Sequence, residues 1–196
     1  MKLAIPDYPF KAYLFDCDGT VADSMPPHYI AWKRALDEWG ANFTQEQFYG
    51  WGGLPSEVVI ERLNQEQGLH MDAAQIAVRK EEFYYESLPT LKAVPEVLEH
   101  VLDAYGRIPI AIVSGSTRES VVASLTALGL LDRFNTLVCA GDYIHGKPNP
   151  EPFLMAAERL GVAAADCLVF EDAMPGIEAA KTAGMAWVKV PLPWER

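Results

Sequence analysis

Two aspartates separated by one residue follow an apolar run near the start of the chain. Asp16 and Asp18 come directly after Ala12–Phe15 and precede a Gly-Thr pair. Because side chains alternate along an extended strand, we expect both carboxylates to point to one side. At about 4 Å and an effective dielectric constant of about 20, their repulsion is on the order of 4 kcal/mol. A cation or a proton must neutralise such a pair, so the spacing predicts a metal site or an acid–base dyad. A turn at Asp18 and a helix cap at Asp16 are the structural alternatives.

A second segment places small hydroxyl residues after a β-branched run. Ser114, Gly115 and Ser116 follow Ile112 and Val113, and a helical pattern comes next. A serine hydroxyl, an accessible glycine backbone and the free amides of a helix start together favour an anion such as phosphate. The alternative is structural, because Ser116 and the glutamate three residues later have the spacing of a capping box.

The third segment carries one lysine in a stiffened loop. Lys147 stands between a glycine and a proline, shortly before a helical pattern. Its ammonium group is suited to bind a phosphoryl oxygen as a point charge. The alternative is a solvated loop lysine.

The fourth segment ends an apolar run with two adjacent acids. Glu171 and Asp172 precede Pro175, which suits the first turn of a helix. Either acid is an alternative cap for that helix. The functional interpretation adds Asp172 to the aspartates near position 16 as an oxygen ligand, with Glu171 close by. Oxygen ligands without histidine or cysteine favour Mg²⁺ over zinc.

The segments that must position these side chains alternate between strand-like and helix-like patterns. The expected strands are Ala12–Phe15, 108–113, Thr136–Ala140, 167–170 and 186–190, and the expected helices are 95–105, 118–128, Glu151–Leu160 and 175–183. Glycines just beyond three of the helices indicate where they stop. This alternation predicts an α/β class with a Rossmann-like, doubly wound parallel sheet. Ligands bind such sheets beyond the carboxyl ends of the strands, where all four segments would lie.

One stretch interrupts this alternation. Residues 25–90 contain helical patterns only, over 27–39, 57–67 and 72–88. We therefore expect a small helical cap domain of residues 25–90, inserted after the first strand into a core domain of residues 1–24 and 91–196.

Composition narrows the functional classes. Half of the 196 residues are hydrophobic and the net charge is −11, which argues against nucleic acid and anionic membranes as partners. The three cysteines show no zinc spacing, so buried free thiols in a reducing compartment are expected. No signal peptide or membrane-spanning stretch is evident, and we expect a cytoplasmic protein.

The four segments, taken in order, resemble the motifs of the haloacid dehalogenase superfamily of phosphohydrolases. The matching residues are Asp16–Thr20 with Asp23 and Ser24, then Ser114–Ser116, Lys147 with Pro148, and 171–185. The resemblance covers essentially the whole chain, and its subgroup is that of the β-phosphoglucomutase-like sugar phosphatases, which include fructose-1-phosphate phosphatase. The chain departs from the pattern twice. Ala173 replaces a common serine, and the loop 49–56 lacks an arginine.

The resemblance implies roles for individual residues. Asp16 would be the nucleophile and Asp18 the general acid and base. Mg²⁺, the implied cofactor, would be held by the Asp16 carboxylate, the Asp18 carbonyl and Asp172, with Glu171 beside them. Ser114, Lys147 and the Gly115 amide would hold the phosphoryl oxygens. Ser116, Arg118 and His28 are the further candidates for contact with the substrate.

Three functions remain open from the sequence. The first is a phosphatase of a small sugar phosphate, acting through an aspartyl-phosphate. The second is a phosphosugar mutase, which needs a second phosphate clamp and usually supplies it with arginine. The third is a non-enzymatic aspartyl-phosphate receiver or binding module, which would lack the second aspartate and the cap. The expected partner is a small phosphorylated metabolite, and the expected state is a monomer or weak dimer.

Overall fold

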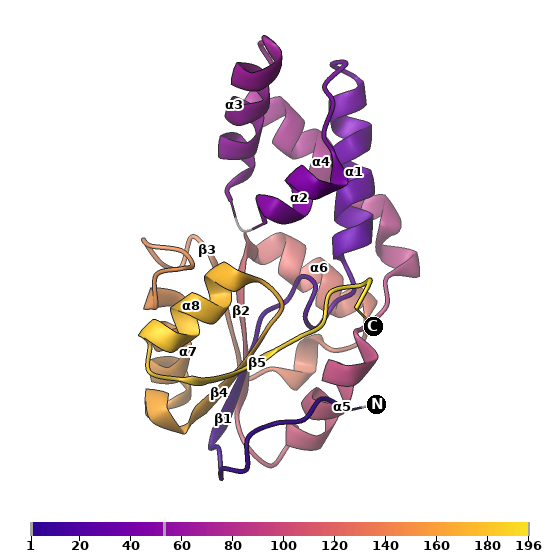
Figure 1. Ribbon diagram of the computed structural model, residues 1–196. Coiled ribbons are helices and arrows are strands. Elements are labelled where there is room, and N and C mark those ends of the chain that lie inside the picture. Colours follow the sequence, from indigo (N-terminus) through magenta and orange to yellow (C-terminus); the bar gives the residue numbers. More distant parts are fainter. Residues whose placement is uncertain (1, 53, 196) are drawn as a thin grey trace. The chain divides into compact units, whose positions relative to one another are not determined.

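The computed structural model describes residues 2–52 and 54–195 of the chain, and Figure 1 shows its elements. It divides into two compact units, one of Met1–Asp23 with Leu91–Arg196 and the other of Ser24–Thr90. Met1 and Arg196, at the ends of the predicted core domain, and Gly53, in the loop 49–56, lie outside the described residues. Within the described part, every helix is too short or too polar to span a bilayer.

The first unit is built on a parallel sheet of five strands in the order β3-β2-β1-β4-β5. The strands are β1 (Ala12–Phe15), β2 (Ile110–Thr117), β3 (Thr136–Ala140), β4 (Cys167–Glu171) and β5 (Ala186–Lys189). The central strands are apolar runs buried on both faces, as a sheet covered by helices requires. The predicted α/β class and parallel sheet are confirmed.

Helices cover both faces of this sheet. They are α5 (Pro95–Ala104), α6 (Arg118–Ala127), α7 (Glu151–Leu160) and α8 (Met174–Thr182), with the 3-10 turns η2 (Leu131–Arg133) and η3 (Ala164–Asp166). One buried cluster joins the sheet to Val101 of α5 and Leu125 of α6. The other joins it to Phe153 of α7 and Ala180 of α8. Figure 1 shows these two helix pairs on opposite sides of the strands. The sheet is therefore doubly wound, as predicted.

Element ends agree with the predicted stops, with one exception. Helix α7 ends at Gly161, which takes the left-handed conformation with φ of +67° that glycine adopts without steric cost. Strand β2 runs four residues past its expected end at Val113, to Thr117. The extension follows a register irregularity between Val113 and Thr117, after which Thr117 pairs with Ala140 of β3.

The second unit is helical. It contains α1 (Met25–Asp37), α2 (Gln45–Gly50), α3 (Ser56–Gln67), α4 (Ala73–Ser87) and η1 (Leu88–Thr90). Its core includes Leu36 of α1, Leu63 of α3 and Tyr84 of α4. Helix α2 was not predicted. It begins at a capping box in which the Thr44 hydroxyl accepts the Gln47 amide and the Gln47 side chain accepts the Thr44 amide.

Candidate active site

The chain leaves strand geometry directly after β1, and this decides where the two N-terminal aspartates point. The Asp16 amide donates to the carbonyl of Phe170 in β4 at 3.0 Å. A turn follows, in which the amides of Val21 and Ala22 donate to the Cys17 carbonyl at 3.0 and 2.9 Å. Strand alternation therefore does not extend to Asp18. Its carboxylate accepts a hydrogen bond from the Ser116 hydroxyl at 2.7 Å.

The close carboxylates belong to Asp16, Glu171 and Asp172. One oxygen from each lies within 4.8 Å of the others, and all three side chains are buried. The sequence predicts repulsion between Asp16 and Asp18, and Asp18 does raise the pKa of Asp16. The carboxylate that most raises the pKa of Asp16 is Glu171, whereas Asp18 has the smallest effect of the groups named. The reason is the turn after β1, together with the pairing of β1 with β4.

Lys147 supplies a positive charge to this cluster. Its Nζ lies 2.7 Å from Asp16 Oδ1, 2.7 Å from Glu171 Oε2 and 2.9 Å from the Val113 carbonyl oxygen. Only 12% of the side chain is exposed. The alternative of a solvated loop lysine is therefore wrong, and the ammonium group joins the ends of β1 and β4 to the middle of β2.

Burial and neighbouring charges shift the pKa values of these groups. Burial raises the pKa of Asp16 well above its usual range, and Glu171 adds to the shift while Lys147 opposes it. Burial, reinforced by Glu171, raises the pKa of Asp172 to about 7. Burial alone would lower the pKa of Lys147, but the charges of Asp16 and Glu171 outweigh it and the pKa is raised. Three acids thus share one ammonium group, and burial without a cation favours the protonated forms of Asp16 and Asp172.

The residues present fit a hard divalent cation. Three carboxylates face one ammonium group, and the cluster contains no imidazole or thiol. Cys17 is adjacent in sequence, but burial raises the pKa of its thiol well above the usual range, so it stays protonated. The Thr20 hydroxyl donates to Asp172 Oδ1 at 3.3 Å and helps to orient that carboxylate. Oxygen donors of this kind suit Mg²⁺.

Ser114 follows Val113, whose carbonyl accepts from Lys147. Its side chain is buried, and its Oγ accepts the Ser116 amide at 3.0 Å. The Tyr143 hydroxyl donates to the Ser114 carbonyl oxygen at 3.1 Å. Gly115 is exposed, and a Cβ placed there would meet nothing within 4 Å. A backbone of this kind is open to the close approach of an anion.

The capping box at Ser116 and Glu119, the structural alternative for this segment, is not formed. Helix α6 is capped one residue later by Thr117, whose hydroxyl accepts the Ser120 amide at 3.3 Å. The cause is the extension of β2 to Thr117, which leaves the Ser116 hydroxyl directed to Asp18.

Two predicted substrate contacts lie outside this cluster. Arg118 donates to Asp142 Oδ2 at 2.6 Å and to the Leu137 carbonyl, and Arg159 also donates to Asp142. This ion pair joins α6 to the end of β3. His28 belongs to the helical unit, where its buried ring stacks on Tyr84 with centroids 3.8 Å apart. The roles of both in substrate binding stay predictions.

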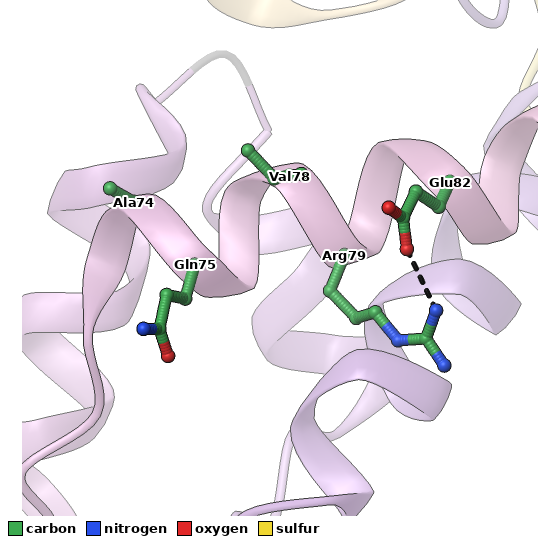
Figure 2. A pocket seen from close by; sticks show the side chains of 5 residues that line it. All are labelled: Ala74, Gln75, Val78, Arg79 and Glu82. Atoms are coloured by element: carbon green, nitrogen blue, oxygen red, sulfur yellow. Dashed lines mark hydrogen bonds and ion pairs between the residues drawn. The ribbon is translucent and has the colours of Figure 1, made fainter.

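Two surface hollows contain none of the predicted site residues. One has a volume of about 420 Å³ and lies on α4. Figure 2 shows the side chains that line it, those of Ala74, Gln75, Val78, Arg79 and Glu82. Arg79 and Glu82 form an ion pair there at 2.7 Å. The other, of about 580 Å³, is lined by residues 105–109 and 132–135, which precede β2 and β3. Neither hollow brings together groups that the candidate chemistry needs.

Sequence reasoning missed two supporting residues. Thr20 belongs to the first motif, but its link to Asp172 depends on the pairing of β1 with β4. Tyr143 shows no pattern in the sequence that would single it out. Its hydrogen bond to Ser114 spans 29 positions, so only the fold reveals it.

Comparison with known proteins identifies the family. A family model described as haloacid dehalogenase-like hydrolase matches residues 13–190. The fructose-1-phosphate phosphatase YqaB of Escherichia coli is 33% identical over 184 residues, covering 93% of this chain and 97% of the relative. The β-phosphoglucomutase of Bacillus subtilis is 30% identical over 192 residues, covering 92% and 83%. A crystal structure of β-phosphoglucomutase from Clostridium difficile matches with a TM-score of 0.82 and 26% identity, covering 95% of this chain and 86% of that chain.

The chain therefore belongs to the haloacid dehalogenase-like hydrolases. The predicted family and its β-phosphoglucomutase-like subgroup are confirmed. The predicted enzyme class, a phosphoric monoester hydrolase, agrees with relatives that are named phosphatases.

Proposed function

We propose that this member of the haloacid dehalogenase-like hydrolases is a Mg²⁺-dependent phosphatase of a small sugar phosphate. One observation carries the proposal. Asp16, Glu171 and Asp172 form a buried cluster of acids, and Lys147 joins this cluster to the carbonyl of Val113, the residue before Ser114. A nucleophilic carboxylate, hard-cation ligands and phosphate-binding groups are the components that phosphoryl transfer to an aspartate requires.

The proposed reaction has two steps. In the first, an Asp16 oxygen bonds to phosphorus, and the bond between phosphorus and the sugar oxygen breaks. Asp18 gives its proton to the leaving sugar oxygen. In the second step, Asp18 takes a proton from water, whose oxygen bonds to phosphorus while the acyl-phosphate bond breaks. Inorganic phosphate leaves, and Asp16 and Asp18 return to their starting forms.

The neighbouring residues would bind the phosphoryl oxygens and orient Asp18 during both steps. The Lys147 ammonium group, already 2.7 Å from Asp16, is placed to hold a phosphoryl oxygen beside the nucleophile. The Ser114 hydroxyl and the Gly115 amide would hold the others. The Ser116 hydroxyl, 2.7 Å from Asp18, orients the acid that serves the leaving group.

Asp16, the Asp18 carbonyl and Asp172 would hold Mg²⁺, and Glu171 would support them through Lys147. The bound ion would offset the repulsion between the nucleophile and the anionic substrate. The sharing of one ammonium group by three acids supports this assignment.

The substrate we favour resembles fructose-1-phosphate, and mutase activity is the competing function. A mutase must hold a second phosphate, and the loop 49–56 contains no lysine or arginine. The Arg62 guanidinium, however, lies 5.5 Å from the ring centroid of Trp51, so a cation is present beside this loop. The relatives include both a phosphatase and a mutase.

Product analysis distinguishes the two functions. Purified protein would be incubated with fructose-1-phosphate, glucose-1-phosphate or β-glucose-1-phosphate, with Mg²⁺ or with EDTA. We expect Mg²⁺-dependent release of inorganic phosphate that is absent in Asp16→Asn. Isomerisation of β-glucose-1-phosphate to glucose-6-phosphate without net phosphate release would replace this proposal with the mutase. A stable phosphorylated protein without turnover would indicate a receiver.

A further inference from the structure

Gly176 lies in the first turn of α8, where the backbone does not require glycine. It follows Met174 and Pro175, which begin the helix, and it is buried. Its φ is not among the positive values found at other glycines of the chain. Glycine is among the poorest helix formers, so an alanine would be favoured here on conformational grounds. Glycine at this position is therefore explained by the atoms packed against it and not by its backbone conformation.

That space is filled by Glu171. A Cβ at position 176 would lie 2.0 Å from Glu171 Oε2, 2.1 Å from its Cδ and 2.6 Å from its Cγ. These separations are far below any non-bonded contact. A Cβ at Gly115 or Gly50, in contrast, would meet nothing within 4 Å. The Glu171 side chain thus occupies the volume that a side chain at 176 would need.

The Glu171 side chain is held in place by hydrogen bonds to both of its carboxylate oxygens and by burial. Its Oε2 accepts from Lys147 at 2.7 Å, and its Oε1 accepts the Ala173 amide at 3.2 Å. Only 2% of the residue is exposed. Lys147 in turn contacts Asp16 at 2.7 Å. A displacement of Glu171 would therefore reach the ammonium group that faces the candidate nucleophile.

We infer that Gly176 is a positioning residue of this site. Because it has no side chain, Glu171 can lie against the first turn of α8 and hold Lys147 on Asp16. The effect on turnover rests on the proposed function, whereas the effect on the packing of Glu171 does not.

The test is a double-mutant cycle between positions 176 and 171. The variants are Gly176→Ala, Glu171→Ala and the double variant. Thr182→Ala is the control, an exposed position on the same helix. In the wild-type background, Gly176→Ala should lower kcat for phosphate release about 10- to 100-fold, the size of effect that a misplacement near 1 Å produces. It should also lower the melting temperature, although alanine is the better helix former.

In the Glu171→Ala background, the methyl group at 176 meets no carboxylate. The same change should then cause no further loss of kcat and should raise the melting temperature by about 2–3 °C through helix propensity. The control should keep the wild-type kcat. A general defect in α8 would lower the melting temperature in both backgrounds and would not produce a fall in one and a rise in the other.

Two results would overturn the inference. One is an unchanged kcat and melting temperature in Gly176→Ala, and the other is an equal fall in melting temperature in both backgrounds. If Glu171→Ala does not fold, a crystal structure of Gly176→Ala decides. A Glu171 carboxylate displaced from Lys147 supports the inference, and one still in contact with Lys147 overturns it. If the wild type releases phosphate from no sugar phosphate, the proposed function fails, while the melting temperatures still decide the role of Gly176.

Discussion

Replacing Asp16 with asparagine is expected to abolish turnover and, without divalent metal, to stabilise the fold. Both effects have one cause. Asp16 is buried beside Glu171 and Asp172, with Lys147 as its counter-charge. Asparagine keeps the shape and an oxygen that can accept from Lys147, but it removes the charge and the nucleophile.

The size of the effect follows from the distances. The oxygens of the three acids lie within 4.8 Å of one another. At this separation and an effective dielectric constant of about 20, each repulsion on Asp16 is at least about 3.5 kcal/mol. Lys147 attracts Asp16 from 2.7 Å. On the same scale this attraction is about 6 kcal/mol, so the two repulsions exceed it by about 1 kcal/mol. The burial of a charge adds to this excess. Because the raised pKa of Asp16 lets a proton relieve part of this excess, the variant should melt up to about 2–4 °C above the wild type.

Thermal unfolding at pH 7.5, in EDTA and in excess MgCl₂, measures this effect. In EDTA, Asp16→Asn should melt above the wild type. Mg²⁺ should raise the melting temperature of the wild type more than that of the variant, which has lost a charged ligand. Asp37→Asn is the matched control, because the Asp37 side chain is 63% exposed and lies outside the site. If Asp16→Asn melts below the wild type in EDTA, the charge argument is wrong. If it keeps wild-type turnover, Asp16 is not the nucleophile.

Three further predictions concern the metal, the ion pair at α6 and the pH dependence of stability. Mg²⁺ at about 100 times its dissociation constant should stabilise the wild type by about 2.7 kcal/mol, a rise of roughly 5–11 °C in melting temperature. EDTA should remove both this rise and the release of phosphate, and activity that persists in EDTA would exclude the proposed metal role. Asp142→Ala should lower the free energy of unfolding by about 1 kcal/mol in urea titrations, because the half-exposed Arg118 and Arg159 lose a shared charged acceptor. The Mg²⁺ dependence of that variant should remain that of the wild type, and a changed metal affinity would contradict a purely structural role for the ion pair. Burial lowers the pKa of His100, although its hydrogen bond to Leu3 opposes the shift. His100 therefore takes up a proton near pH 6.5 in the unfolded chain but only at lower pH in the folded chain. Acidification from pH 7.5 to 5.5 should thus lower the free energy of unfolding of the wild type. His100→Gln, which has the same active-site carboxylates, should show a smaller loss over this range, and an equal loss in both proteins would exclude His100 as the cause.

The sequence was sufficient to predict which residues reach the edge of the sheet. The apolar runs before Asp16, Ser114 and Glu171 are long enough to identify as buried strands, and helices end at glycines such as Gly161. Parallel strands joined by helices bring their carboxyl ends to one edge whatever their order. These are local patterns combined with one topological rule, and they were enough to predict the fold class.

The local geometry just beyond a strand was harder to predict. Asp18 was placed beside Asp16 by strand alternation, whereas a turn from Cys17 to Ala22 sets its position, and that placement stays a prediction. The capping box that was the alternative at Ser116 is not formed, and Thr117 caps α6 instead because β2 continues past an irregularity. Helix α2 was missed although its Thr44-x-x-Gln47 signal is present, since a helix of six residues offers little periodicity.

The distribution of charge within the site depends on contacts that no local pattern contains. Lys147 joins Asp16 and Glu171 across 131 and 24 positions of the chain. The spacing of Glu171 and Asp172 before Pro175 suggests helix caps as readily as it suggests ligands. The pairing of β4 with β1 favours the ligand interpretation, because it brings Glu171 and Asp172 close to the buried carboxylate of Asp16. The glycine at position 176 likewise depends on a contact that no local pattern contains. Its position in a helix predicts alanine, and only the place of the Glu171 side chain explains the glycine. The functional meaning of a residue here thus follows from the neighbour with which the fold pairs it, and paired substitutions are the measurement that reveals it.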